Sequence, residues 1–169
     1  MRKKELLELG KRLGLARDKT HWGLALRGCV DGAPVFVAQY EDTMGRDPRP
    51  RPFTELRVER PSAWRGALFG ASPGYSGDTG DRAFDDRFRW MPDPMLPDAS
   101  RPDYLGSPHV RQALLELDSS AAAAIGHEGI VVFQIDHLET STRMMFLTHL
   151  PQTALVERAL RLLLEIAGS

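Results

Sequence analysis

The chain has 169 residues, of which 42% are hydrophobic and 27% are charged, a composition typical of one soluble globular domain with a buried core. Its formal net charge is -1 at pH 7, so it lacks the basic surplus that bulk binding to nucleic acid or to an anionic membrane requires. We therefore expect a single domain over residues 1–169 and do not expect nucleic acid as a partner.

Three features of the sequence predict a cytoplasmic protein. Cys29 is the only cysteine, so no disulfide can form within the chain. Glu5 and Glu8 interrupt the apolar run near the N-terminus, which is not the pattern of a secretory signal peptide. No stretch of about 18 apolar residues occurs, and we expect no membrane-spanning helix.

The N-terminal third has the pattern of a helix followed by three strands. Residues 2–13 place leucines on one helical face and charges on the other. Residues 21–40 alternate between apolar and polar around Asp31 and Gly32, a pair that favours the tight turn of a β-hairpin. Residues 53–59 alternate in the same way and predict a third strand.

A tract rich in proline and glycine follows, at about residues 61–106. Ten of the twelve prolines lie between positions 48 and 108. A long loop region in a compact domain is usually either functional or partly disordered. We expect short strands at residues 67–69 and 84–91 and irregular structure in the remainder of this tract.

Regular patterning resumes at Ser107, which is a good helix N-cap before a proline at the first helical position. After that helix, residues 121–125 and 130–136 predict a second hairpin, residues 143–149 a further strand, and Pro151 the start of a final helix. The predicted order is α-β-β-β, an irregular tract, then α-β-β-β-α. This order indicates an α+β fold with N-terminal, central and C-terminal helices on one face of a mostly antiparallel sheet.

Residues 70–74 (Gly-Ala-Ser-Pro-Gly) match the G-x-S-x-G pattern around the nucleophile of α/β-hydrolases. Pro73 counts against this role for Ser72, because the oxyanion hole needs the backbone N–H of the residue after the serine. The predicted antiparallel hairpins also differ from the parallel sheet of that fold. We interpret the segment as a glycine-proline turn, and we expect no catalytic residue.

The metal-binding patterns of this sequence are incomplete. The acids of the central tract offer oxygen ligands, but their spacing fails the EF-hand pattern; they are Asp78, Asp81, Asp85 and Asp86. The histidines form no H-x-x-x-H pair, although His137 and His149 could meet across neighbouring strands. We interpret the histidines as packing or surface residues and Cys29 as a structural thiol. No metal and no cofactor are expected.

A run of arginines with interleaved aromatics could contact phosphates and stack on bases. Its members are Arg46, Arg49, Arg51, Phe53, Arg57, Arg60, Trp64 and Arg65. Glu55 and Glu59 partly balance these charges, and the sequence pI is about 6.5. We therefore interpret the run as a solvated loop and strand face.

Residues 77–90 combine four acids, three arginines and three aromatics. Phe84 and Phe88 share a side whether the segment is a helical turn or a strand. We expect both rings to anchor the tract to the core, with Asp81 and Asp85 in local hydrogen bonds. We call these four residues and Trp90 the central box, which is the candidate structural or interaction site.

The order of motifs resembles that of a loosely defined group of uncharacterised bacterial domains. The matching segments are Leu13-Gly14-Leu15, Asp31-Gly32, the box at residues 80–88, the helix start at residues 107–115, and Glu128-Gly129. Such domains are often cytosolic portions of membrane proteins, whereas this sequence predicts no membrane helix. The resemblance implies a similar fold and carries no assigned activity.

Our leading hypothesis is a non-catalytic cytoplasmic domain that acts through contacts with an unidentified protein partner, including a second copy as a homodimer. One alternative is a dimer like the type III secretion chaperones, which have a similar order of elements but are usually acidic. The other alternative is a small metal-dependent hydrolase that uses the central acids and a histidine of the 137–149 region.

Overall fold

All strands of the described chain join one antiparallel sheet of eight strands, in the order β1-β2-β3-β4-β8-β7-β5-β6. The computed structural model describes residues 3–43, 49–62, 64–70, 79–95, 101–127 and 131–168. The strands are β1 (Ala16–Asp18), β2 (Leu24–Val30), β3 (Ala33–Asp42), β4 (Arg51–Val58), β5 (Gly66–Gly70), β6 (Phe88–Pro92), β7 (Phe133–His137) and β8 (Thr142–Phe146).

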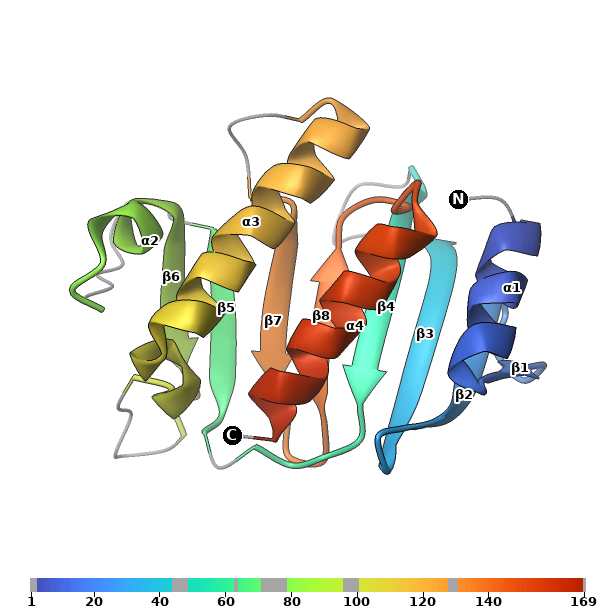
Figure 1. The fold of residues 1–169 in the computed structure, drawn as a ribbon, viewed down its shortest axis with the longest axis horizontal. Helices are drawn as coiled ribbons and strands as arrows, with labels where there is room; N and C mark the ends of the chain where they lie inside the picture. Colours follow the sequence, from blue (N-terminus) through green and yellow to red (C-terminus); the bar gives the residue numbers. More distant parts are fainter. Residues whose placement is uncertain are drawn as a thin grey trace.

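The described helices lie on one side of this sheet (Figure 1). They are α1 (Lys3–Leu13), α2 (Arg82–Arg87), the short 3-10 helix η1 (Asp103–Gly106), α3 (Pro108–Ile125) and α4 (Thr153–Ala167). Figure 1 shows α3 and α4 crossing the middle of the sheet and α1 lying over the end that carries β1 and β2. The α+β class and the antiparallel sheet predicted from the sequence are confirmed.

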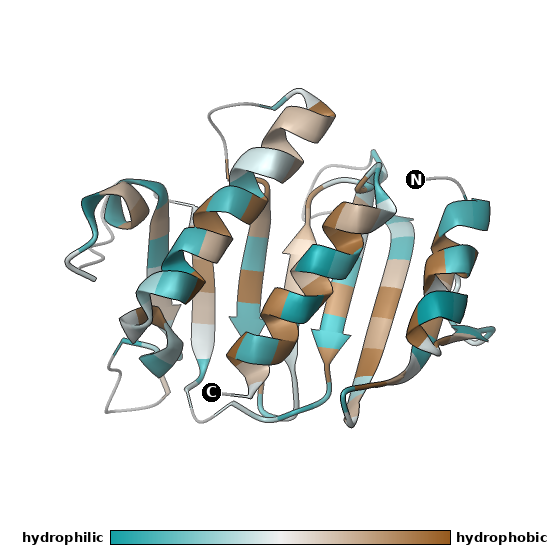
Figure 2. Cartoon of the chain, viewed as in Figure 1, coloured by the Kyte–Doolittle hydropathy of each residue, from teal (hydrophilic) through white to brown (hydrophobic). Residues whose placement is uncertain are grey.

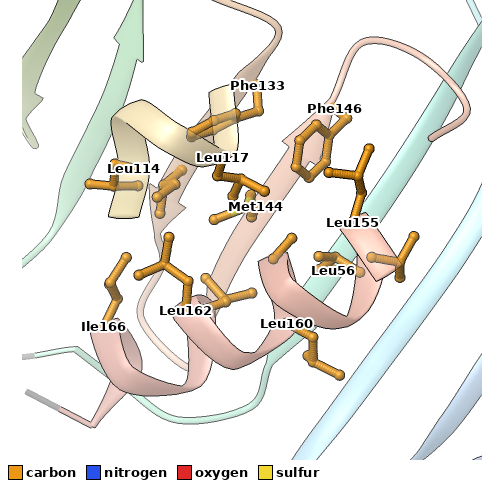
Figure 3. Packing of buried hydrophobic residues seen from close by; sticks show 14 of the residues in the cluster. Leu56, Leu114, Leu117, Phe133, Met144, Phe146, Leu155, Leu160, Leu162 and Ile166 are labelled. Atoms are coloured by element: carbon orange, nitrogen blue, oxygen red, sulfur yellow. The ribbon is translucent and has the colours of Figure 1, made fainter. Parts of the chain in front are cut away.

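The main core lies between the helices and the sheet. Leu56 of β4 pairs with Val37 of β3 on one side and with Met144 of β8 on the other, and all three side chains are fully buried. Leucines of α3 and α4 fill the space above them (Figure 3). Hydrophobic and hydrophilic residues alternate along both helices, as expected of helices with one buried side (Figure 2). We call this side of the sheet the helix-covered face.

The opposite side carries a different set of residues. Because side chains alternate along a strand, Phe36, Arg57, Arg143 and Asp136 project away from the helices. Phe36 belongs to a second, separate apolar cluster with Ala25 and Ala38. We call this side the helix-free face, since no helix of the described residues packs against it.

The first predicted hairpin is correct in its strands and its turn. Asp31 and Gly32 both have positive φ, of 50° and 73°, as a tight turn with this twist requires. The short strand β1 (Ala16–Asp18) was not predicted and extends the sheet beyond β2.

The first strand of the predicted hairpin, residues 121–125, is wrong, whereas the strand expected at residues 130–136 is found in part as β7. Residues 121–125 are the last turns of α3, which ends where Gly126 adopts a φ of 72°. Alanine has the highest helix propensity of all residues, and Ala121 continues the buried stripe of Leu114 and Leu117. The C-terminal hairpin is instead formed by β7 and β8.

The described part of the tract of residues 61–106 is more regular than predicted. The strand expected at residues 67–69 is confirmed as β5, which pairs with both β6 and β7. The strand expected at residues 84–91 is partly wrong, because α2 occupies its first half and β6 begins only at Phe88. The tract therefore completes one edge of the sheet.

Candidate functional site

The central box begins at the N-terminus of α2, where Asp81 is the N-cap. Its Oδ1 accepts a hydrogen bond from the backbone N–H of Phe84, and its Oδ2 accepts one from Nε of Arg111 at 3.2 Å. These two contacts hold the pKa of Asp81 below its usual value, the bond from Phe84 having the larger effect. Asp85 accepts hydrogen bonds from the backbone N–H and the hydroxyl of Thr79. The two carboxylates thus hold the backbone of the residues that lead into α2.

The aromatic members of the box point into the core. Phe84 and Phe88 are fully buried, and their rings stack with centroids 5.0 Å apart. Phe88 also packs against Phe133 of β7, and Trp90 is partly buried against the same cluster. The predicted burial of the two phenylalanines is confirmed, and their rings have no surface to offer a partner in the folded protein. Any functional role of the box stays a prediction.

Asp118 of α3 is a buried acid that the sequence reading did not single out. Its Oδ2 accepts hydrogen bonds from Nε and Nη2 of Arg87, and its Oδ1 accepts one from the backbone N–H of Val132. One carboxylate therefore joins α2, α3 and the start of β7. The sequence does contain one indication of this buried acid. Asp118 follows Leu117 on the apolar stripe of the helix, where a carboxylate needs a partner inside the protein.

His137 and His149 do not form a common site. His137 is 3% exposed. Its ring stacks on Tyr104, and its Nε2 lies 3.0 Å from the Tyr104 hydroxyl. Burial lowers the pKa of His137 to about 4, because the charged form is poorly solvated there. His149 instead lies 3.0 Å from the backbone carbonyl of Tyr40. Within the described ranges, no three His, Cys, Asp or Glu side chains are grouped to hold a metal ion.

The helix-free face carries a row of charged and aromatic residues across five strands. Strand register places Arg27, Phe36, Arg57, Arg143 and Asp136 side by side, from β2 through β3, β4 and β8 to β7. The guanidinium carbons of Arg27 and Arg57 lie 5.1 and 4.7 Å from the centroid of the Phe36 ring, within the range of cation–π attraction. Two arginines thus cover one phenylalanine.

Two of the three arginines in this row are hydrogen-bonded to acids of the same face. Arg27 donates to Asp18 at 3.3 Å and also bonds Glu59. Arg143 donates through Nε and Nη2 to Asp136, at 3.1 and 2.7 Å. Their charges are therefore largely compensated inside the protein.

Arg57 makes a longer ion pair than the other two. Its Nε is buried and has no hydrogen bond, and it lies 3.8 Å from Oε1 of Glu55 in an ion pair. Oε2 of Glu55 accepts a hydrogen bond from the hydroxyl of Tyr40 at 3.0 Å. The guanidinium of Arg57 therefore lies over the Phe36 ring and beside Glu55, and its buried Nε makes no hydrogen bond.

An aromatic cluster adjoins the row on the same side. His21 packs against both Phe36 and Tyr40, and Trp22 packs edge-on against Tyr40 with centroids 5.1 Å apart. Burial and the nearby Glu55 raise the pKa of Tyr40 to about 12. Trp22 is 67% exposed, so the cluster ends in an indole ring that faces solvent.

Several sequence candidates lie elsewhere or outside the described residues. Arg57 and Phe53 are members of the predicted arginine run that lie on the helix-free face, and the run was interpreted only as a solvated surface. Ser72, Asp78, Arg46 and the matched pair at positions 128 and 129 lie outside the described residues. The row itself was not predicted, because the pairing of β4 with β8 cannot be read from local patterns.

Comparisons with protein-family models, with curated proteins and with solved structures found no match. The resemblance to a group of bacterial domains therefore stays a prediction. No described helix has the length and apolar character needed to cross a membrane.

Proposed function

We propose that this protein is a non-catalytic cytoplasmic module that binds another protein through the helix-free face of its sheet. The observation that carries the proposal is the row on this face together with the adjoining aromatic cluster, which ends in Trp22 with 67% of its surface exposed. Tryptophan, tyrosine and arginine are the residues that most often dominate protein interfaces. Their gathering on one side of the sheet supports a binding role for that side.

The burial pattern of the two faces supports the same choice. The helix-covered face is filled by α1, α3 and α4, so its apolar side chains already have partners within the chain. The helix-free face combines an apolar floor of Ala25, Phe36 and Ala38 with charged side chains above it. Interfaces that form and dissociate commonly have an apolar centre with polar groups around it.

Photochemical crosslinking in the native host tests the proposal. Trp22 is replaced by photoreactive benzoylphenylalanine, and a control carries the same residue in place of Arg161, which is exposed on α4. We expect a discrete crosslinked protein from position 22 and none from position 161. Equal adducts from both positions, or none from position 22, would contradict the proposal.

A homodimer through the same face is the second candidate, as in the chaperone-like alternative. The face carries both arginines and carboxylates, so two copies related by a twofold axis could pair opposite charges. Sedimentation equilibrium of the purified chain separates the two candidates. A particle of twice the chain mass that dissociates when Trp22 is replaced by alanine favours the homodimer, whereas a monomer at high concentration favours a different partner.

A further inference from the structure

The ring of His137, at the end of β7, contacts two other aromatic side chains. Tyr104 of η1 stacks on it with ring centroids 5.3 Å apart. Trp64, from the connection between β4 and β5, packs edge-on against it with centroids 5.1 Å apart. His137 and Tyr104 are 3% and 6% exposed, whereas Trp64 is partly exposed. We call these three residues the aromatic latch.

Trp64 and Tyr104 are held in the latch in different ways. Trp64 belongs to no helix or strand. Its indole lies over Gly66, the strand neighbour of the histidine, where an added Cβ would come within 2.5 Å of Cη2 of the indole. Tyr104 is anchored through the next residue, because Leu105 is fully buried and its carbonyl accepts a hydrogen bond from Arg111 at 2.6 Å. Displacement of the indole therefore exposes the histidine without moving a helix or a strand.

The hydrogen bonds of His137 suit a neutral ring only. Its Nε2 lies 3.0 Å from the hydroxyl of Tyr104, whereas its Nδ1 is buried and has no hydrogen-bond partner among the described residues. Thr142 lies directly opposite on β8, and its Oγ1 is likewise without a partner there. A protonated imidazole carries an N–H donor on both nitrogens. In the closed latch the charged ring would therefore keep one buried donor without an acceptor, which is unfavourable.

The charged groups around the latch do not compensate a positive charge on His137. Asp136 precedes it in β7 but projects to the helix-free face and is bonded to Arg143 of β8. Asp103 of η1 is exposed, β5 carries no charged residue, and Arg65, just before β5, is a cation. Burial therefore outweighs the attraction of Asp136 and lowers the pKa of His137 to about 4.

We propose that protonation of His137 opens the aromatic latch by displacing Trp64, while the sheet and the helices stay folded. The open latch lets water solvate the charged ring and pair with Nδ1, and the closed latch allows neither. The proposal is independent of the proposed binding face, because His137 projects to the helix-covered side of the sheet.

The direction of the pH effect follows from the proton affinities of the two states. The closed latch has a His137 pKa of about 4, and a solvated histidine has a pKa of about 6.5, so the open latch binds more protons between these pH values. Closure is therefore fully favoured above about pH 6.5 and is weakened as the pH falls. Between pH 7.5 and pH 5 the ratio of open to closed latch rises about 30-fold.

Fluorine NMR of the whole chain labelled with 5-fluorotryptophan tests the proposal. The chain has three tryptophans, and each resonance is assigned by replacing one of them with phenylalanine. Saturation transfer then measures the population of a minor state at each position. We expect the minor state of Trp64 to rise about 30-fold from pH 7.5 to pH 5, while Trp22, Trp90 and the far-ultraviolet circular dichroism stay unchanged.

Three variants assign the response to one histidine. His137→Phe keeps an aromatic ring in the latch and cannot be protonated, and His137→Gln is a second neutral replacement of different shape. His109→Gln removes a histidine whose side chain is 77% exposed and is the matched control. We expect the rise at Trp64 to be absent from both variants of His137 and to be of native size in His109→Gln.

Two results would overturn the proposal. One is a Trp64 minor state that stays constant down to pH 5, or that still rises about 30-fold in both variants of His137. The other is a joint change of all three tryptophans with loss of the circular dichroism signal. That result would show that protonation unfolds the whole domain and that the latch does not open separately.

Discussion

The side chains on the two faces of the sheet are stabilised by different interactions. On the helix-covered face, apolar side chains from strands and helices fill the space between the layers, and the polar groups there are deeply buried, as Asp118 and His137 are. On the helix-free face, arginines lie over Phe36 and are paired with acids that remain partly exposed to water. The first face depends on packing for stability, whereas the second keeps charged groups available at the surface. This difference predicts where substitutions change stability and where they change binding.

The largest expected effect is on the helix-covered face. Phe84→Ala removes a ring that is fully buried and stacked on Phe88, and we expect it to lower the free energy of unfolding by about 3–5 kcal/mol. Urea denaturation followed by circular dichroism measures this change. Trp22→Ala on the helix-free face is the matched aromatic control. If both variants lost the same stability, the contrast between the faces would be wrong.

A somewhat smaller loss is expected from Asp118→Asn. The carboxylate is 1% exposed and forms an ion pair with Arg87, so the variant loses a buried ion pair. Removing one partner of such a pair costs about 3 kcal/mol. The same urea denaturation gives the value, and amide hydrogen exchange at Val132 should become faster because its N–H donates to Asp118. Unchanged exchange there would exclude the proposed bridge between α3 and β7.

Acid pH should weaken the helix-covered face through His137. Its folded pKa of about 4 lies below the ordinary value of about 6.5, so the unfolded chain binds more protons between these two pH values. The stability contribution is therefore complete above about pH 6.5, and about 2 kcal/mol of it is lost on going from pH 7.5 to pH 5. Unfolding measured at both pH values checks this, and the loss should be smaller in His137→Phe. An identical loss in that variant would assign it to other groups.

The smallest effect on stability is expected on the helix-free face. Arg143→Gln breaks an ion pair with Asp136 whose side chains are 30% and 13% exposed, and partly solvated pairs of this kind contribute about 1 kcal/mol or less. Urea denaturation of Arg143→Gln and of Asp118→Asn compares the free energy of unfolding that each face loses when one ion pair is removed. A loss as large as that of Asp118→Asn would mean that the ion pairs of the helix-free face hold the fold together.

Sequence patterns were sufficient for elements defined by their neighbours in the chain. The turn at Asp31 and Gly32 and the N-cap at Ser107 depend on a few adjacent residues, and both occur where they were predicted. Residues 121–125 were misread because a run of alanine and isoleucine suits either a buried strand or a buried helix. The fold as a whole resolved that ambiguity, since α3 continues over the sheet.

The candidate site was harder to predict because long-range pairing creates it. Phe36, Arg57 and Arg143 become neighbours only when β3, β4 and β8 lie side by side, and no local spacing encodes that order. The burial of Phe84 and Phe88 was accessible because their spacing puts both rings on one side in either conformation. The partners of Arg57 could not be foreseen, since they depend on which acid lies nearest to each arginine once the strands are paired.

The strand order has a consequence for how the chain acquires its structure during synthesis. The hairpin of β7 and β8 lies between β4 and β5 in the sheet, although it follows both in the chain. Until about residue 146 has left the ribosome, β4 and β5 each present an unpaired edge, and such edges readily pair with other chains. The last strands to be made therefore join the two parts of the sheet, so a nascent chain that stops short of them exposes two edges open to aggregation.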